Sequence, residues 1–208
     1  MTKHSIAWAA LLALSLPAAA GTGAFGSYLA VDTDGPGAAA ATWYGASQPG
    51  SQTLTSLNGL NLGSFSIGST ATLSGAELLT WKNSGGDVTG AVLHWRVDGG
   101  SYQDIAINWT ANASFTDRAG NAFTNGGDQK WAGLTNTSAN FLAGLTAGSH
   151  TLQVYFTALT NEGNRDSGSA ANPFAASFSV TSPVPEPGSA PLLLAGAALL
   201  AVLRRTRR

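Results

Sequence analysis

The stretch "AVLHWRVDGGSYQDIAINW", residues 91–109, decides the fold class because it is written with a two-residue period. On either side of the Asp-Gly-Gly at 98–100, apolar and polar side chains alternate. Alternation of this kind places one set of side chains on each face of a β-strand, and Asp-Gly favours a tight hairpin turn. The stretch therefore predicts a β-hairpin, with Trp95 and Trp109 both on the face that meets the core.

The same period returns in "SHTLQVYFTALT", residues 149–160, and in "PFAASFSVT", residues 173–181. Clusters of Gly, Asn and Asp separate the candidate strands, as tight turns require. The one segment of the body with a helical pattern is "TSANFLAGL" at 137–145. Several short strands joined by turns predict an all-β fold, an antiparallel β-sandwich, and a jelly-roll variant is equally compatible.

We expect the sandwich to span residues 64–182, after a Gly-, Ala- and Ser-rich stretch over residues 21–63 that favours loops and short strands. Residues 60–181 also resemble the small β-sandwich modules of other exported bacterial proteins, a resemblance that carries no activity with it. The chain has no cysteine. Its own core must therefore hold the domain without disulfides, and thiolate metal sites and cysteine nucleophiles are excluded.

The N-terminal twenty residues have the order of a secretory signal peptide. Lys3 supplies the positive charge, residues 6–16 the apolar run, and the alanines from Ala18 to Ala20 the small residues that signal peptidase needs. Cleavage after Ala20 leaves Gly21 as the first residue of the mature chain. A membrane anchor is the alternative, but the apolar run is far shorter than the ~20 residues of a span.

The C-terminal stretch "VPEPGSAPLLLAGAALLAVLRRTRR", residues 184–208, has three parts. Its prolines make the first part extended and non-helical. The apolar run at 190–203 follows, and as a helix it reaches about 22 Å, short of a hydrocarbon core of about 30 Å. Four arginines end the chain and hold that end on the cytoplasmic side; they are Arg204, Arg205, Arg207 and Arg208.

This three-part order resembles the PEP-CTERM sorting signal of exported bacterial proteins. Pro185, Glu186 and Pro187 match its motif, residues 190–203 its short membrane helix, and the arginines its basic tail. The resemblance covers residues 183–208. It implies that a membrane-embedded exosortase removes the segment, and that the protein reaches the cell surface or the extracellular matrix of an exopolysaccharide-producing bacterium. A simple tail anchor behind a proline-rich linker is the alternative.

The charge of the body argues against a nucleic-acid partner. Residues 21–182 contain five basic and ten acidic residues, a net charge of −5, whereas the whole chain has a formal net charge of −1. The basic residues are scattered along the sequence, so they predict no basic face that could neutralise phosphates.

Candidate catalytic and metal-binding residues all have a simpler interpretation. His94 lies on the polar face of a predicted strand and His150 at the start of another, and no G-x-S-x-G motif accompanies them. The carboxylates stand mostly in turns, where Asp is favoured for backbone hydrogen bonding. We therefore expect no enzyme and no cofactor. A weak structural Ca²⁺ is compatible with the acidic loops at 32–35 and 161–166.

Carbohydrate binding is the alternative function in another class, because sugar rings stack on exposed aromatic faces. Trp43, Trp81 and Trp131 are the candidates, since they do not follow the alternation that assigns Trp95 and Trp109 to the core. The sequence as a whole predicts a non-enzymatic, exported surface or matrix protein associated with exopolysaccharide. A carbohydrate-binding module ranks second and a secreted hydrolase a distant third.

Overall fold

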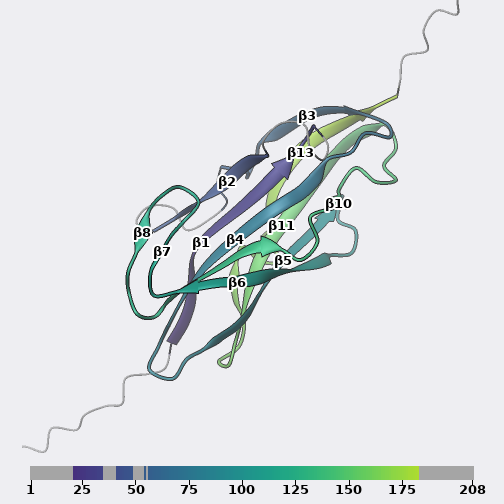
Figure 1. Cartoon of the computed structure of the whole chain (residues 1–208). Helices are drawn as coiled ribbons and strands as arrows, with labels where there is room; N and C mark the ends of the chain where they lie inside the picture. The colour runs from purple at the N-terminus through teal and green to yellow at the C-terminus, as the bar shows by residue number, and fades with distance from the viewer. Residues whose placement is uncertain (1–20, 35–40, 49–53, 55, 183–208) are drawn as a thin grey trace, which may run out of the picture.

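The computed structural model describes residues 21–34, 41–48, 54 and 56–182 of the chain. Within these residues it contains thirteen strands and no helix, which confirms the all-β prediction. The strands are β1 (Gly21–Asp32), β2 (Thr42–Ser47), β3 (Asn61–Ser66), β4 (Thr72–Asn83), β5 (Val88–Val97), β6 (Gln103–Asn112), β7 (Phe115–Thr116), β8 (Ala122–Phe123), β9 (Asp128–Leu134), β10 (Ala139–Asn140), β11 (Gly148–Thr160), β12 (Arg165–Ser167) and β13 (Phe174–Thr181). Figure 1 shows an elongated body whose two chain ends leave at opposite ends.

Eleven strands form one curled sheet in the order β2-β1-β4-β9-β6-β5-β11-β13-β3, with β10 beside β4 and β12 beside β11. Neighbouring strands of this sheet are antiparallel except β13 and β3, which run parallel. The sheet curls so that β1 and β4 face β5 and β11 across a shared interior (Figure 1). The Ser27 and Ser167 hydroxyls, 3.0 Å apart, join the two halves inside it.

The predicted hairpin is confirmed as β5 and β6, which pair with Trp95 opposite Gln103. In the turn, Asp98 has a φ of 52° and Gly99 a φ of 71°. Two consecutive positive φ values give the turn a twist that matches that of the flanking strands, which is why Asp-Gly is favoured there.

The helix candidate at 137–145 is wrong, because this segment contains β10 followed by turns. The side-chain oxygen of Asn140 accepts hydrogen bonds from the backbone N–H groups of Ala71 (3.2 Å) and Leu142 (3.0 Å). Asn side chains that bond to the backbone in this way compete with helix formation.

The sandwich reaches further toward the N-terminus than the expected residues 64–182. Residues 21–63 contribute β1, β2 and the first half of β3 to the same sheet. β1 pairs with β4 over its whole length, beginning with Gly21 opposite Asn83. The first residue after the predicted signal-peptide cleavage site is therefore also the first residue of a paired strand.

Trp109 lies on the surface, so its assignment to the core was wrong. Its side chain is 59% exposed, whereas Trp95 is only 6% exposed. The β6–β9 pairing shifts register on both sides of Trp109, with the extra residue on β9 before it and on β6 after it. Bulges bend a strand and re-aim its side chains, and β6–β9 is where the sheet curls.

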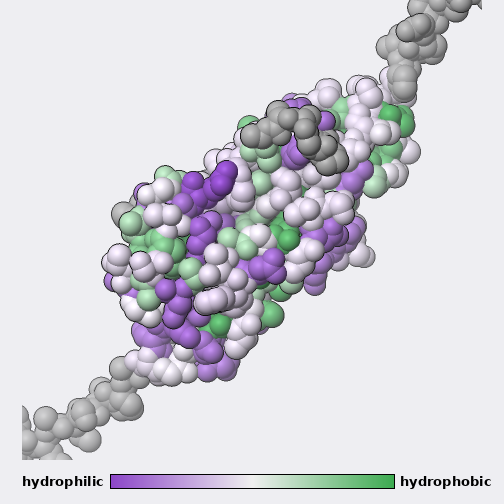
Figure 2. Space-filling model, in the orientation of Figure 1, coloured by the Kyte–Doolittle hydropathy of each residue, from purple (hydrophilic) through white to green (hydrophobic). Residues whose placement is uncertain are grey.

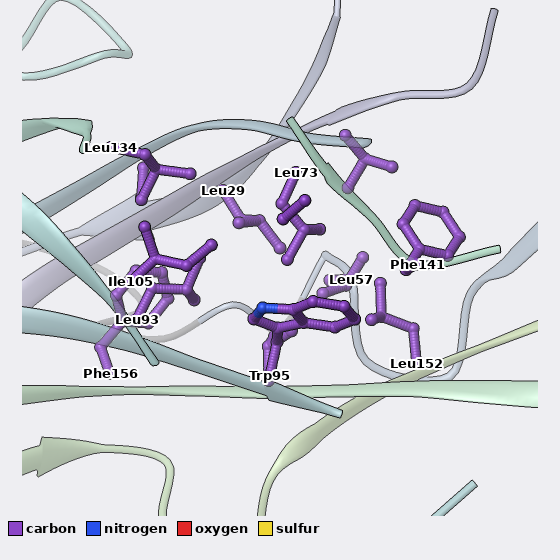
Figure 3. Packing of buried hydrophobic residues seen from close by; sticks show 14 of the residues in the cluster. Leu29, Leu57, Leu73, Leu93, Trp95, Ile105, Leu134, Phe141, Leu152 and Phe156 are labelled. Carbon is purple, nitrogen blue, oxygen red and sulfur yellow. The ribbon is translucent and has the colours of Figure 1, made fainter. Parts of the chain in front are cut away.

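The main core fills the space between the two halves of the sheet (Figure 3). Its largest fully buried members come from both halves. The core residues labelled in Figure 3 are Leu29, Leu57, Leu73, Leu93, Trp95, Ile105, Leu134, Phe141, Leu152 and Phe156. Burying a side chain of this size contributes about 1.5–3 kcal/mol, so a chain without disulfides obtains its stability mainly here.

A second buried cluster lies on the opposite face of β1 and β4, and we call it the outer cluster. It consists of Phe25, Tyr28 and Leu79, with Trp43, Phe115 and Phe123 packed against it. The connection between β6 and β9 covers it. This connection, residues 113–127, carries β7 and β8 and is called the flap (Figure 1). The rings of Phe25 and Phe123 lie 5.1 Å apart, which places the flap directly on β1.

Asp117 of the flap is buried beside the outer cluster and is surrounded by donors. Its Oδ2 accepts hydrogen bonds from the hydroxyls of Tyr28 (2.7 Å) and Ser47 (2.5 Å) and from the Asn121 side chain (2.9 Å). Burial alone would raise the pKa of Asp117, but these hydrogen bonds outweigh it and lower that pKa. Burial raises the pKa of Tyr28 to about 12.

Glu77 of β4 supplies a second buried contact to the flap. It accepts the backbone N–H of Arg118 at 3.0 Å and pairs with the Lys130 ammonium at 2.9 Å. Burial raises the pKa of Glu77, and the bonds from Lys130 offset part of that effect. The flap is thus fixed by two buried carboxylates as well as by its aromatic rings.

Candidate functional site

The predicted processing residues stand mostly outside the described residues. Ala18 and Ala20 precede them. Two groups follow them, namely the motif Pro185, Glu186 and Pro187 and the four arginines Arg204, Arg205, Arg207 and Arg208. Gly21 alone is described, as the first residue of β1. β13 ends at Thr181, so the folded domain occupies the whole interval between the two predicted signals.

The three tryptophans proposed for sugar stacking lie in three different environments. Trp131 is 6% exposed, and its indole N–H donates to the Thr80 hydroxyl at 3.1 Å. It offers no free face to a ligand. Trp43 is half-buried, and the Arg118 guanidinium lies 4.3 Å above its ring. Trp81 is 36% exposed and covers the β1 backbone, in close contact with Gly23.

Sequence reasoning missed a row of aromatic rings on the outer face of β5, β6 and β11, which we call the aromatic row. His94 stacks on Tyr155 with ring centroids 4.3 Å apart, and Tyr155 meets Tyr102 edge-on at 5.0 Å. The Arg96 guanidinium lies 4.2 Å from the Tyr102 ring centre. It also donates to the Gln153 side chain at 2.7 Å. Offset and edge-on pairs of this kind are the favoured aromatic geometries.

The sequence contains part of the information that is needed to predict the aromatic row. Alternation correctly turned His94, Arg96 and Tyr155 toward the solvent face of their strands. Their contact depends on the register that places Tyr155 opposite His94. Register between strands that are distant in sequence could not be read from alternation alone.

His94 is held on both sides by hydrogen bonds. Its Nδ1 lies 2.6 Å from the Asp104 carboxylate and its Nε2 lies 3.0 Å from the Thr157 hydroxyl. That hydroxyl donates its one proton to Asp166 at 2.7 Å. Asp104 and Asp166 can only accept hydrogen bonds, so the Thr157 proton goes to Asp166 and the Asp104 carboxylate accepts from the Nδ1–H of His94.

This Asp–His–Thr line resembles the order of a nucleophile, a base and an orienting acid, but it cannot work as one in this arrangement. A base must accept the proton of the nucleophile, whereas the Thr157 proton points to Asp166. Thr157 is also only 4% exposed. These hydrogen bonds therefore hold the His94 ring in place at the surface and do not activate the Thr157 hydroxyl.

The other candidate acids and bases are individually paired. His150 Nδ1 lies 2.6 Å from Asp98, and the hydrogen bond that the ring donates to that carboxylate raises the pKa of His150. Asp87 pairs with Lys82 at 2.6 Å, and Glu162 lies 3.7 Å from Arg165. Across the described ranges, no group of three or more His, Asp or Glu side chains is placed to hold a metal ion.

The described surface is mixed in character. Figure 2 shows a face on which hydrophobic residues form small, separate patches among polar ones. Large apolar side chains that are well exposed are few among the described residues, namely Ile67, Trp81, Trp109 and Leu159. In the same part of the chain, no helix is long and apolar enough to cross a bilayer.

Comparison with known proteins identifies the C-terminal segment. Residues 183–208 match the family model described as the PEP-CTERM protein-sorting motif. No curated protein matches the chain. The matched residues are those of the proline motif, the apolar run and the arginine tail. The chain thus carries a PEP-CTERM sorting signal directly behind its β-domain, which marks it as an exported protein that is sorted to the cell surface or beyond by way of an exosortase.

Proposed function

We propose that the protein is a non-enzymatic component of the cell surface or extracellular matrix, and that its β-domain is the cargo that the sorting signal delivers. One observation carries the proposal. The folded domain runs from Gly21 to Thr181 and the matched signal begins at residue 183. Signal peptidase would release the domain at its first strand, and exosortase would remove the segment that follows its last strand after a transient stay in the inner membrane.

The absence of catalysis is part of the proposal and is supported by the pairing of the candidate residues. His94 and His150 each have both ring nitrogens engaged. The acidic body is suited to a hydrated polysaccharide matrix, because a net negative charge keeps a protein soluble and apart from polyanions. On this basis we expect no nucleic-acid partner. Association with exopolysaccharide is a further part of the proposal, and it is supported by the PEP-CTERM signal and not by the charge.

The intact mass of the protein from the native host's medium and envelope tests this proposal. We expect a mature form that begins at Gly21 and ends close to Pro185-Glu186-Pro187. A double variant, Pro185→Ala with Pro187→Ala, should keep the segment through Arg208 and remain in the membrane. A wild-type protein found only in membranes with Arg208 still present would instead establish a permanent tail anchor.

Carbohydrate binding is the second candidate function, and the aromatic row favours it. Half-buried rings beside Arg96, Gln153 and Asp104 give a rigid surface with both apolar and hydrogen-bonding groups, as carbohydrate recognition requires. Affinity electrophoresis in gels that contain the host's polysaccharide tests the idea. Tyr102→Ala, at the end of the row, should reduce retardation, and Ile67→Ala, at an exposed apolar residue outside the row, is the control. Equal retardation of the Tyr102 variant and the parent would exclude the row as a sugar site.

A further inference from the structure

A groove opens where β6 and β9 part. The pairing of β6 with β9 ends at Ile107, which lies opposite Leu134. After Leu134 the chain moves away from β6 and returns as β10, which pairs with β4. The part of β6 that precedes Ile107 pairs only with β5. The groove between β6 and β10 has a volume of about 700 Å³, and we call it the edge groove. Its lining contains none of the rings of the aromatic row and shares only Asp104 with the surroundings of that row, so the inference drawn from the groove goes beyond the proposed function.

The edge groove has strand edges as walls and the main core as its floor. Gln103 and Asp104 of β6 form one wall, and Asn140 of β10 stands in the other. Trp95 and Phe141 belong to the floor, and both are buried members of the main core. A ligand in the groove would therefore meet apolar side chains below and polar backbone on both sides.

The backbone of β6 directs hydrogen-bonding groups into the edge groove. The Ala106 carbonyl accepts the Thr135 N–H at 3.0 Å, so the Ala106 peptide groups point away from β5. In an antiparallel strand, residues two apart point their peptide groups in the same direction. The N–H and C=O of Asp104, two residues earlier, consequently face the groove.

The same argument applies to the opposite wall. The Phe141 N–H donates to the Ala71 carbonyl at 3.0 Å, toward the β4 side, and Ala139 pairs with Leu73 of β4. Asn140 lies between these two residues, so its N–H points away from β4 and into the edge groove. Two strand edges thus face each other across the opening.

Trp95 adds a donor that nothing in the described chain satisfies. Its indole N–H is buried and has no acceptor among the described residues. Buried donors are almost always paired, because leaving one unpaired costs about 1–3 kcal/mol. The Trp95 ring forms part of the groove floor, but its indole nitrogen is buried, so this N–H serves as a reporter of the groove and not as a contact for a ligand.

We propose that the edge groove binds a short, extended polypeptide strand, which pairs with β6 at Asp104 and with β10 at Asn140. Peptides recognised in this way supply alternating N–H and C=O groups to the edges, and a side chain enters the pocket between them. The floor selects one apolar side chain. The Asp104 carboxylate and the acidic body select a neutral or basic strand over an acidic one.

A sugar or an anion fits the edge groove less well. The two aromatic floor residues are buried in the main core, so neither presents an open face on which a sugar ring could stack. The charged residue of the lining is an acid, Asp104. A peptide is the ligand whose regular alternation of donors and acceptors matches two facing strand edges.

Nuclear magnetic resonance on the full-length, ¹⁵N-labelled chain in detergent micelles tests the proposal. The probes are acetylated and amidated pentapeptides of sequence Lys-Thr-X-Thr-Lys, with Val, Ile, Leu or Phe as X. At least one peptide should produce saturable shifts of the Asp104 and Asn140 backbone N–H signals and of the Trp95 indole N–H. Backbone N-methylation of X should weaken that peptide at least tenfold, because it removes the hydrogen bond to the strand edge.

Two variants and a second probe complete the test. Ala143→Trp places a bulky ring on the exposed rim of the groove and should abolish binding, and Ala171→Trp, an exposed residue that does not line the groove, should leave it unchanged. The proposal is overturned by the absence of saturable shifts with all four peptides at millimolar concentration. Equal binding of the N-methylated form overturns it too, as do shifts of the same signals by cellopentaose but by none of the peptides.

Discussion

The main core and the outer cluster bury side chains on opposite faces of β1 and β4, but they are closed in different ways. The main core is closed by the sheet itself, which curls until its two halves meet, and its members are apolar. The outer cluster is closed by the flap, whose position depends on the buried carboxylates of Asp117 and Glu77. The comparison teaches that alternation along strands builds the first, whereas a polar network between distant segments builds the second.

Removing a ring from the main core should have the largest effect on stability. Phe156→Ala, at a fully buried position of β11, should lower the free energy of unfolding by about 3–5 kcal/mol, because it leaves a cavity in a packed interior. Urea titration measures this. Leu159→Ala on the same strand, where the side chain is partly exposed, is the control and should cost much less. Similar losses for the two variants would contradict the assignment of the main core.

Removing the carboxylate of the flap should come next. Asp117→Ala leaves the buried hydroxyls of Tyr28 and Ser47 without their acceptor, which should cost about 2–3 kcal/mol. Hydrogen exchange should show faster exchange of the flap amides, with those of β11 unchanged. Asp87→Ala, which removes an exposed partner of Lys82, is the control and should leave both measurements nearly unchanged. If β11 lost protection together with the flap, the two clusters would form one cooperative unit.

The pH dependence of the free energy of unfolding should distinguish the two buried carboxylates that hold the flap, Asp117 and Glu77. The pKa of Asp117 is lowered below its ordinary value of 3.8, so its ionised form stabilises the folded state above that pH. The stability difference between the wild type and Asp117→Asn should therefore be constant near neutrality and shrink as the pH falls through the folded pKa.

Glu77 should behave in the opposite sense, because its pKa is raised on folding. The folded state takes up this proton more readily, so stability relative to Glu77→Gln should increase as the pH falls through the raised pKa. Urea titrations at a series of pH values measure both differences. Parallel trends for the two variants would show that the buried environments have been assigned incorrectly.

The smallest effect on stability is expected at Trp109, the exposed tryptophan of β6. Trp109→Ala should change the free energy of unfolding by less than about 0.5 kcal/mol, since surface side chains contribute little. The variant should also lose the emission that acrylamide quenches most readily, whereas Trp131→Phe should not. A cost like that of Phe156→Ala would mean that Trp109 belongs to the main core after all.

Alternation was enough to predict β5, β6, β11 and β13, together with the turn at Asp98 and Gly99, but not β1 and β4, which also line the main core. It failed at Trp109, which lies between two register shifts of β6 against β9, and such shifts leave no mark in the composition. It also failed at residues 137–145, where the side chain of Asn140 captures backbone groups that a helix would need.

The outer cluster and the aromatic row could not be predicted for a different reason. Both require knowing which distant strands are neighbours. Asp117 looks like any acidic loop residue until the flap is folded onto Tyr28, and Tyr155 meets His94 only in one register of β11 against β5. Local patterns carry no information about such pairings, although they placed His94, Arg96 and Tyr155 on the correct face.

The position of β13 has a mechanical consequence. The chain leaves the domain at Thr181, at the end of a strand held along its length by β11 on one side and by β3 on the other. Tension applied to that end, by a moving matrix or by a membrane that retains the tail, is directed along the strand. It loads the hydrogen bonds of both ladders at once, in shear, instead of opening them one after another. The tether is thus attached where the domain resists pulling well.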